Sequence, residues 1–140
     1  MKRRTLEFLW AWFDALRRRD TESMAAALDL DVVWQGARPD LVCHGPDEVI
    51  GGFMTAYDEN QEIDSLELLG DDRHIVVGVR ARELAVDDLD TAGEIYNVFT
   101  IDGDKITRID DYLRRDEALR AANIAIGSAS ACGPVPRRRN

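Results

Sequence analysis

Two adjacent aspartates near the end of one segment are the residues best suited to carry chemistry. Asp110 and Asp111 lie in residues 106–113, where apolar and polar residues alternate as they do in a β-strand. Because successive side chains of a strand point to opposite faces, one aspartate should face the interior and the other solvent. From the residues alone, either can be the inner one. A carboxylate on an inner face can move a proton or anchor a ligand.

Two arginines are candidates to meet this carboxylate. Arg80 and Arg82 share one face of a strand predicted over residues 73–86. An arginine beside the inner aspartate would serve either as an electrostatic partner in catalysis or as half of a structural ion pair. Two arginines near one carboxylate would favour an anionic ligand. The alternative for Arg82 is a solvated position at the end of the strand.

Other side chains could line a pocket around the aspartate. His44 precedes a Gly-Pro pair and could titrate near neutrality at the pocket mouth, or it could bond to backbone in a loop. Trp34 and Tyr57 are either pocket walls or ordinary core residues. Asn97 and Phe99 share one face of residues 95–101, and we expect this face to be the inner one.

The elements that must position these residues are predicted from periodicity and turn chemistry. Apolar residues recur at helical spacing early in the chain, and Asp102-Gly103 separates two β-rich segments in the manner of a hairpin. We predict helices over residues 5–19, 21–28, 45–60 and 116–124, and strands over 31–36, 63–69, 73–86, 95–101 and 106–113, with a loop over 37–45 and an acidic loop over 87–93. This segregated order predicts an α+β fold. A cone-shaped, curved antiparallel sheet would pack against the three N-terminal helices.

An apolar sheet face predicts a homodimer. Ile75, Val77, Val79 and Ala81 share one face of residues 73–86, and we assign this face to the convex side of the sheet. A second copy of the chain would cover such a face in a two-fold dimer.

Composition narrows the classes of function. The 140 residues carry a net charge of −9, which disfavours a nucleic-acid partner. We expect one domain over residues 1–124 and a disordered basic tail over 125–140. There is no apolar run of membrane-spanning length and no secretory signal, so a cytoplasmic protein without a membrane partner is expected. The two cysteines and two histidines lack metal-binding spacing, and we expect neither a metal nor a cofactor.

The order of these elements resembles a known superfamily. A DVVW-type strand, a His-Gly-Pro before the third helix and a final GDKITRIDDYL segment are similar to the nuclear transport factor 2-like superfamily, and more closely to its SnoaL-like branch. The resemblance implies a cone fold whose members include isomerases, cyclases, dehydratases, epoxide hydrolases and non-catalytic binders.

Comparison with the limonene-epoxide-hydrolase-like members of the superfamily assigns particular residues to the site. In that pattern the final Asp corresponds to Asp111 and the Arg to Arg80, which implies that both point into the cone and that Asp110 points outward. Three groups that would hold and activate water are replaced, by Trp34, Gly36 and Arg82. These residues cannot act as a base, so epoxide hydrolysis is disfavoured.

The sequence thus leads to two hypotheses. In the first, the protein binds a hydrophobic ligand with a polar or anionic group and performs cofactor-free isomerisation, cyclisation or hydration. Asp111 would move the proton, Arg80 and Arg82 would stabilise the oxyanion, and His44 or Tyr57 would assist. In the second, the cone is filled by side chains such as Trp34, and the protein is a non-catalytic dimeric binding or assembly module. An open cavity larger than about 300 Å³ would favour the first hypothesis.

Overall fold

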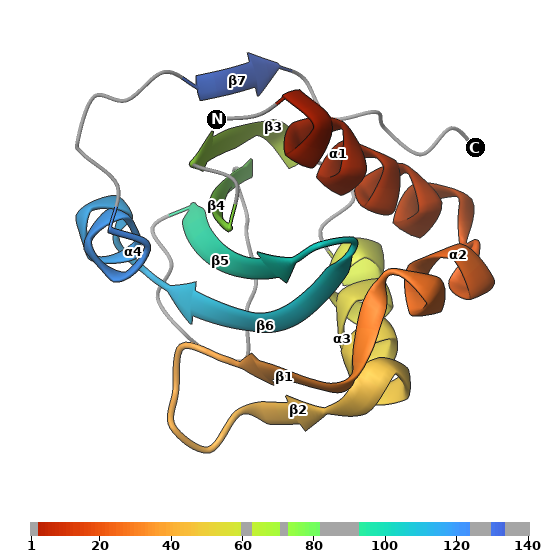
Figure 1. Ribbon diagram of the computed structural model, residues 1–140. Helices are drawn as coiled ribbons and strands as arrows, with labels where there is room; N and C mark the ends of the chain where they lie inside the picture. The colour runs from red at the N-terminus through yellow and green to blue at the C-terminus, as the bar shows by residue number, and fades with distance from the viewer. Residues whose placement is uncertain (1–2, 60–62, 71–72, 82–92, 124–129, 134–140) are drawn as a thin grey trace.

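A seven-stranded sheet with helices on both faces forms the frame of the molecule. The computed structural model describes residues 3–59, 63–70, 73–81, 93–123 and 130–133. The elements follow one another along the chain as α1 (Arg3–Arg18), α2 (Thr21–Ala26), β1 (Leu28–Gln35), β2 (Val42–His44), α3 (Gly45–Glu59), β3 (Ile63–Gly70), β4 (His74–Ala81), β5 (Glu94–Asp102), β6 (Lys105–Tyr112), α4 (Arg115–Ala121) and β7 (Ser130–Gly133) (Figure 1). The predicted α+β class is therefore confirmed.

The strands lie in the order β2-β1-β6-β5-β4-β3-β7. All neighbouring pairs are antiparallel except β1 and β6, which run parallel. The sheet is thus mixed, and the expectation of a purely antiparallel sheet is wrong in this detail. The reason is that no turn joins β1 to β6, so no local signal in the sequence reports their relative direction.

The hairpin of β5 and β6 forms as predicted. The register pairs Asp102 with Lys105 across the turn, and Gly103 has a φ of 64°, the left-handed conformation that glycine adopts without steric cost. The hairpin places Asn97 directly opposite Asp111. Since both residues come from the centre of the sheet, their side chains are carried by well-paired backbone.

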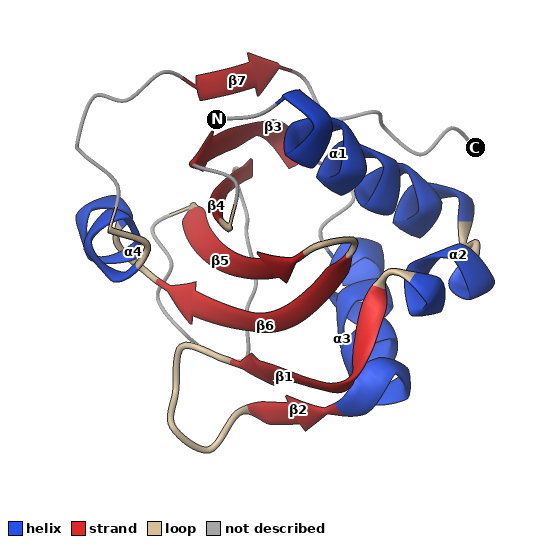
Figure 2. Ribbon diagram, viewed as in Figure 1, coloured by secondary structure: helices blue, strands red, loops and turns tan. Residues whose placement is uncertain are grey.

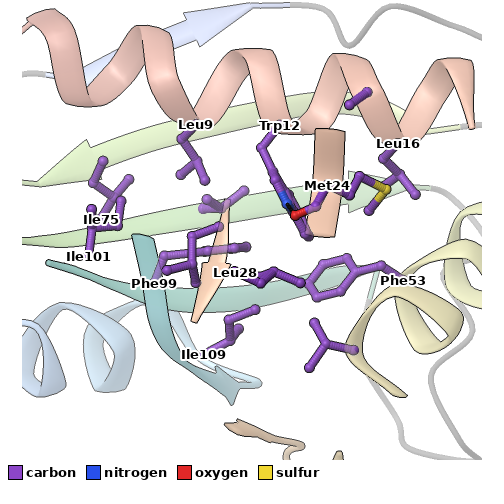
Figure 3. Close-up of a cluster of buried hydrophobic side chains, with 14 of the residues drawn as sticks. Leu9, Trp12, Leu16, Met24, Leu28, Phe53, Ile75, Phe99, Ile101 and Ile109 are labelled. Carbon is purple, nitrogen blue, oxygen red and sulfur yellow. Dashed lines mark hydrogen bonds between the residues drawn. The ribbon is translucent and has the colours of Figure 1, made fainter. Parts of the chain in front are cut away.

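Helices α1 and α3 cover the inner face of the curved sheet, and α4 packs on the opposite face (Figure 2). The main core lies between α1, α2, α3 and the sheet (Figure 3). Its largest buried side chains come from every layer; those labelled in Figure 3 are Leu9, Trp12, Leu16, Met24, Leu28, Phe53, Ile75, Phe99, Ile101 and Ile109. A smaller cluster, which includes Val76, Tyr96, Val98 and Leu119, fills the space under α4.

Strand β4 has the opposite orientation to the one predicted. Ile75 and Val77 are fully buried in the main core, and Val79 packs against it. Val76, on the other face, is 1% exposed and belongs to the cluster under α4. The face that we assigned to a dimer interface is therefore the inner face, covered by the helices. Both faces of β4 are apolar, so hydrophobic alternation could not distinguish them.

Two short edge strands are absent from the sequence predictions. Strand β2 lies within the segment predicted as a loop over residues 37–45 and pairs with β1. Strand β7 lies within the predicted disordered tail and pairs with β3. The tail prediction is therefore wrong for Ser130–Gly133, since a short edge strand depends on a partner distant in sequence rather than on its own composition. The predicted acidic loop lies almost wholly outside the described residues.

Within the described ranges, no helix combines the length and apolar character that crossing a membrane requires.

Candidate functional site

A cavity of about 600 Å³ opens beside the core, between the helices and the inner face of the sheet. Its walls come from α1, from β1 with the segment that leads to β2, from α3, and from the inner faces of β3 to β6. The lining residues are Trp10, Phe13, Asp14, Leu16, Arg17, Trp34, Gly36, Ala37, Asp40, Leu41, Val42, Cys43, Glu48, Gly51, Gly52, Phe53, Thr55, Ala56, Tyr57, Glu59, Leu66, Val79, Ile95, Asn97 and Asp111.

Asp111 is a buried carboxylate in this wall, with 8% of the residue exposed. Its Oδ1 accepts a hydrogen bond from Trp34 Nε1–H at 2.8 Å and another from Asn97 Nδ2–H at 2.5 Å. Strands β1 and β5 flank β6 in the sheet, so the two donors reach Asp111 from opposite sides. These hydrogen bonds fix the orientation of the carboxylate.

The indole of Trp34 is itself held by helix α3. It stacks on Phe53 with ring centroids 4.2 Å apart and an interplanar angle of 26°. A Cβ atom at Gly52 would lie 2.6 Å from Trp34 Cζ3, so only glycine leaves room for the ring here. Helix α3 therefore determines where the Trp34 donor can lie, and through it the position of Asp111.

The orientation of the two aspartates agrees with the prediction. Asp110 points to the opposite face, where its Oδ2 pairs with Arg108 Nε at 2.9 Å. Asn97 lies on the cavity face as expected, whereas Tyr96 lies in the cluster under α4. The alternation of side chains along β5 and β6 accounts for both results.

The structure does not bring Arg80 to Asp111. The Arg80 side chain is 63% exposed, and its Nε lies 3.4 Å from Glu94 Oε1. Arg80 shares the outer face of β4 with Val76, so strand alternation excludes it from the cavity wall. The inward orientation implied by the limonene-epoxide-hydrolase-like pattern is therefore wrong for this arginine. Arg82, the other predicted arginine, lies outside the described residues.

The remaining predicted pocket residues divide into two groups. Trp34 and Tyr57 line the cavity. His44 is exposed and does not line it; its backbone N–H donates to Glu48 Oε1 at 3.0 Å. Phe99 is fully buried in the aromatic part of the main core, 5.7 Å from Trp12 and 5.8 Å from Phe13 between ring centroids. It therefore fills the core beside the cavity rather than forming the cavity wall.

A profile of the SnoaL-like domain matches residues 10–109. The chain belongs to the SnoaL-like domain family. The match covers the elements from α1 to β6, and Asp111 lies two residues beyond it. No curated protein matches the sequence significantly.

Several solved structures of other proteins have a fold similar to that of this SnoaL-like protein. A Sinorhizobium meliloti protein provisionally named a polyketide cyclase is 17% identical, with a TM-score of 0.57 over 76% of this chain and 94% of its own. A nuclear transport factor 2-like protein of unknown function from Cytophaga hutchinsonii is 15% identical, with a TM-score of 0.54 over 77% and 97%. A de novo designed protein with a curved β-sheet is 15% identical, with a TM-score of 0.61 over 88% and 98%. At these identities the similarity concerns the fold alone.

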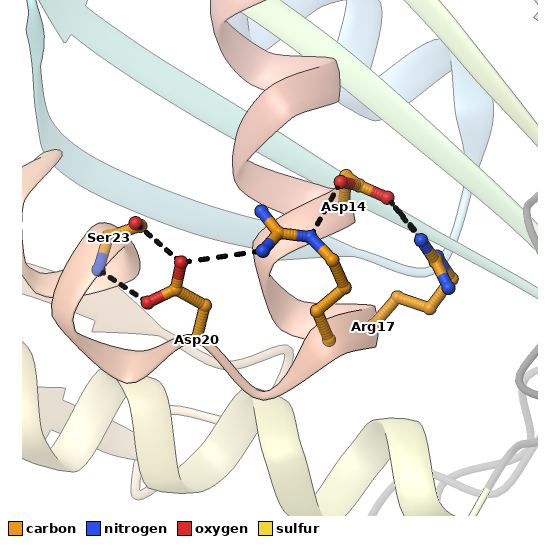
Figure 4. Close-up of polar contacts among 5 residues, drawn as sticks. Asp14, Arg17, Asp20 and Ser23 are labelled. Atoms are coloured by element: carbon orange, nitrogen blue, oxygen red, sulfur yellow. Dashed lines mark hydrogen bonds and ion pairs between the residues drawn. The ribbon is translucent and has the colours of Figure 1, made fainter.

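Helix α1 contributes to the cavity of the SnoaL-like domain, although no pocket residue was predicted in it. Trp10 and Phe13 line it, and so does the ion pair of Asp14 with Arg17, 2.7 Å apart (Figure 4). Hydrogen bonds from Arg17 and Arg18 lower the pKa of the Asp14 carboxyl below its usual value. The i, i+3 spacing could have predicted this ion pair, but only the three-dimensional packing shows that it borders a cavity.

Among the residues that the structure describes, no group of three or more histidine, cysteine or acidic side chains could hold a metal ion.

Proposed function

We propose that this SnoaL-like protein binds an apolar small molecule with a polar group in the cavity, and that Asp111 acts on it as a general acid–base. The volume of about 600 Å³ falls within the range of about 300–1,000 Å³ typical of small-molecule sites. The observation that carries the proposal is the buried carboxylate of Asp111 in an otherwise largely apolar wall, oriented by Trp34 and Asn97.

The chemistry that suits one oriented carboxylate is proton transfer without a cofactor. In an isomerisation or cyclisation, Asp111 would take a proton from one carbon or oxygen of the ligand and return it to another. In a hydration, it would take a proton from the attacking water and deliver it to a carbon of the ligand. Trp34 and Asn97 would hold the carboxylate in place during the transfer, which lowers the cost of reorganisation. Arg80 has no part in this scheme because it lies on the other face of the sheet.

Ligand binding without turnover is the second candidate. The same two hydrogen bonds that orient a base also suit an anchor for a ligand donor group. By contrast, the assembly module with a filled cone loses support, because Trp34 and Tyr57 border an open space of about 600 Å³. Epoxide hydrolysis also lacks support, since Trp34 provides an N–H donor and no acceptor for water.

The test is a thermal-shift screen of steroids, polyketides and fatty acids, followed by turnover assays on each hit. We expect Asp111→Asn to lose the hits of the parent protein or their turnover. Asp110→Asn is the matched control, because that carboxylate lies on the opposite face and pairs with Arg108. A hit that binds and reacts equally with Asp111→Asn would remove Asp111 from the site. Binding that is lost without any turnover in the parent would favour the second candidate.

A homodimer and a cytoplasmic location stay predictions. The sheet face first assigned to the dimer is buried under the helices, so a dimer would need another surface. Light scattering coupled to size-exclusion chromatography would measure the mass in solution and compare it with the 15.8 kDa of one chain.

A further inference from the structure

We propose that Gln35 is a positioning residue of the cavity, and that the turn it holds sets the size of the ligand that the cavity accepts. This turn, residues 36–41, joins β1 to β2 (Figure 2). The inference rests on the proposed function, because it concerns the ligand of the same cavity. Gln35 does not itself line the cavity, so it acts on the ligand through the 36–41 turn.

The 36–41 turn is the irregular part of the described cavity wall. Gly36, Ala37, Asp40 and Leu41 line the cavity, and all other described lining residues belong to helices or strands. Helices and strands keep their shape through regular backbone hydrogen bonds, whereas a turn needs other contacts to keep one shape. The contacts that hold this turn therefore determine the shape of the wall on this side.

Two backbone hydrogen bonds close the 36–41 turn. Gly36 N–H donates to Leu41 O at 2.6 Å, and Leu41 N–H donates to Arg38 O at 3.0 Å. The two ends approach so closely that a Cβ at Gly36 would lie 2.6 Å from Leu41 Cβ. Each carbonyl oxygen has two lone pairs, so the oxygens of the turn can accept further hydrogen bonds.

The side-chain amide of Gln35 donates to these carbonyl oxygens. Its Nε2 lies 3.0 Å from Arg38 O and 3.2 Å from Gly36 O, with Leu41 O at 3.4 Å and Pro39 O at 3.5 Å. An amide nitrogen carries two hydrogens, so the two shorter contacts are the stronger ones. The carbonyl oxygens also fix which end of the amide lies here, since they would repel the amide oxygen. Gln35 thus ties the turn to the end of β1.

An ion pair within the turn is the competing explanation for its shape. Arg38 Nε lies 3.3 Å from Asp40 Oδ1, but the two side chains are 40% and 72% exposed. Exposed ion pairs contribute little to stability. Most contacts of the Gln35 amide are partly buried, where water competes less for the donors. The main hold on the turn is therefore the amide of Gln35.

A closed turn limits the space for a ligand on this side. Ala37 and Leu41 are the apolar lining residues of the turn, so a ligand that reaches them must fit the space they leave. The turn can move aside for a larger ligand only by breaking the hydrogen bonds of Gln35. Opening it would give a larger ligand more room and would remove contacts from a smaller one.

The first measurement is hydrogen exchange of the full chain by NMR, which needs no ligand. Gln35→Glu keeps the size of the side chain but loses the N–H donors, so we expect the Gly36 and Leu41 N–H groups to exchange at least about tenfold faster. Gln35→Lys is the matched control, because its ammonium supplies donors, and its exchange should stay within about threefold of the parent. Amides of β5 should exchange alike in all three. If Gln35→Glu does not fold, Gln35→Met removes the donors without adding a charge.

The second measurement compares two probes that share a polar group. Binding of 1-naphthalenemethanol and 9-anthracenemethanol to the full chain is measured by equilibrium dialysis. Gln35→Glu should shift the ratio of the two affinities at least about fivefold toward the larger probe, and Gln35→Lys should leave it within about twofold. A loss of stability alone would lower both affinities together, so the ratio reports the shape of the wall.

A change of the turn that leaves Gln35 intact gives an independent test. Leu41→Ala removes apolar atoms from the wall, so the ratio should shift about threefold or more toward the larger probe. Leu30→Ala is the matched control, because Leu30 is 84% exposed and does not line the cavity. It should leave the ratio unchanged.

The outcomes separate this inference from the proposed function. Unchanged exchange of Gly36 and Leu41 in the folded donor-free variant would overturn the positioning role of Gln35, and so would Gln35→Lys exchanging as fast as that variant. If both probes bind but neither Gln35→Glu nor Leu41→Ala moves their ratio beyond about twofold, the size limit is overturned and the proposed site stands. If neither probe binds the folded parent, the proposed site and the size limit are both overturned, whereas the exchange rates still decide the role of Gln35.

Discussion

Asp111 owes its place to donors from two different strands. Asn97 faces it across the β5–β6 hairpin, and Trp34 approaches from β1 on the other side. Both donors are neutral, and their hydrogen bonds offset part of the cost of burying the carboxylate. Arg80 pairs with Glu94 instead. The two hydrogen bonds thus hold the carboxylate in one orientation in the cavity wall.

Removing the Trp34 donor tests this arrangement. Trp34→Phe keeps an aromatic ring against Phe53 but loses the hydrogen bond to Asp111. Because the acceptor is a buried carboxylate, we expect the free energy of unfolding to fall by about 1.5–3 kcal/mol in urea titrations. Trp10→Phe is the control, since it changes an indole of the same cavity that does not bond to Asp111. Equal decreases in the free energy of unfolding of the two variants would show that the lost ring volume, and not the lost hydrogen bond, causes the destabilisation.

Ionisation of Tyr96 should make the free energy of unfolding depend on pH in the alkaline range. Burial, together with the hydrogen bond that its hydroxyl donates to Glu94, raises the pKa of Tyr96 from 10.0 to about 12. Because the folded pKa is the higher one, the unfolded state loses the proton first as pH rises. The stabilisation is present below pH 10 and is lost on the way to about pH 12.

We therefore expect Tyr96→Phe to flatten the fall in the free energy of unfolding over this pH window. Urea titrations at several pH values would measure the slope. Some slope should stay, since burial also raises the pKa of Tyr112. Identical slopes in the parent and the variant would contradict the assignment to Tyr96.

Strand periodicity predicted part of the site, and the reason lies in the neighbours of each residue. In β6, alternation requires Asp110 and Asp111 to face opposite sides, and the resemblance to the limonene-epoxide-hydrolase-like pattern selected Asp111 as the inner one. In β4, Val76 and Val77 are both buried, one under α4 and the other in the main core. When both faces of a strand are apolar, the alternation of side chains does not indicate which face is the inner one. The prediction therefore placed Arg80 on the wrong face of β4.

At the scale of elements, the site depends on the approach of α3 to β1. The stacked rings of Trp34 and Phe53 fill this contact, and Gly52 provides the space that the indole needs. Glycine in the middle of a helix costs about 1 kcal/mol relative to alanine. Glycine at position 52 thus lowers the stability of helix α3 but leaves the space that positions the Trp34 donor.

Two adjacent glycines of α3 allow a matched test. A Cβ at Gly51 would meet nothing within 4 Å, whereas one at Gly52 would meet Trp34 Cζ3 at 2.6 Å. We expect Gly51→Ala to raise the free energy of unfolding by about 0.4–1 kcal/mol. Gly52→Ala should show no such gain, because Trp34 must move, and the tryptophan emission spectrum should shift. A stabilised Gly52→Ala with an unchanged spectrum would mean that the indole has room to spare.

Elements with local signals were predicted well, and those with distant partners were not. Gly45-Pro46 and the following acidic residues mark the start of α3, and Asp102-Gly103 marks the hairpin turn. No comparable signal exists for the short edge strands β2 and β7 or for the parallel direction of β1 and β6. Their formation depends on backbone pairing with strands far away in the sequence.

At the scale of the whole molecule, one sheet separates two environments. The face under α4 is closely packed, with Val76, Tyr96 and Leu119 almost fully buried. The inner face is packed at its core end by rings such as Phe99 and opens into the cavity at the other end. An added side chain should therefore be tolerated at the cavity and resisted under α4.

Strand β4 allows this difference to be measured with one substitution at two positions. Val79→Phe extends into the cavity of about 600 Å³, so the free energy of unfolding should change by less than about 1 kcal/mol. Val76→Phe adds the same ring where the residue is 1% exposed, and it should cost about 1–3 kcal/mol through overpacking. Urea titrations would compare the two variants. Val79→Phe should also weaken any cavity ligand at least about tenfold, because the ring takes its space. A strongly destabilised Val79→Phe would mean that the cavity is closed in solution, and the binding of a small molecule there would lose its basis.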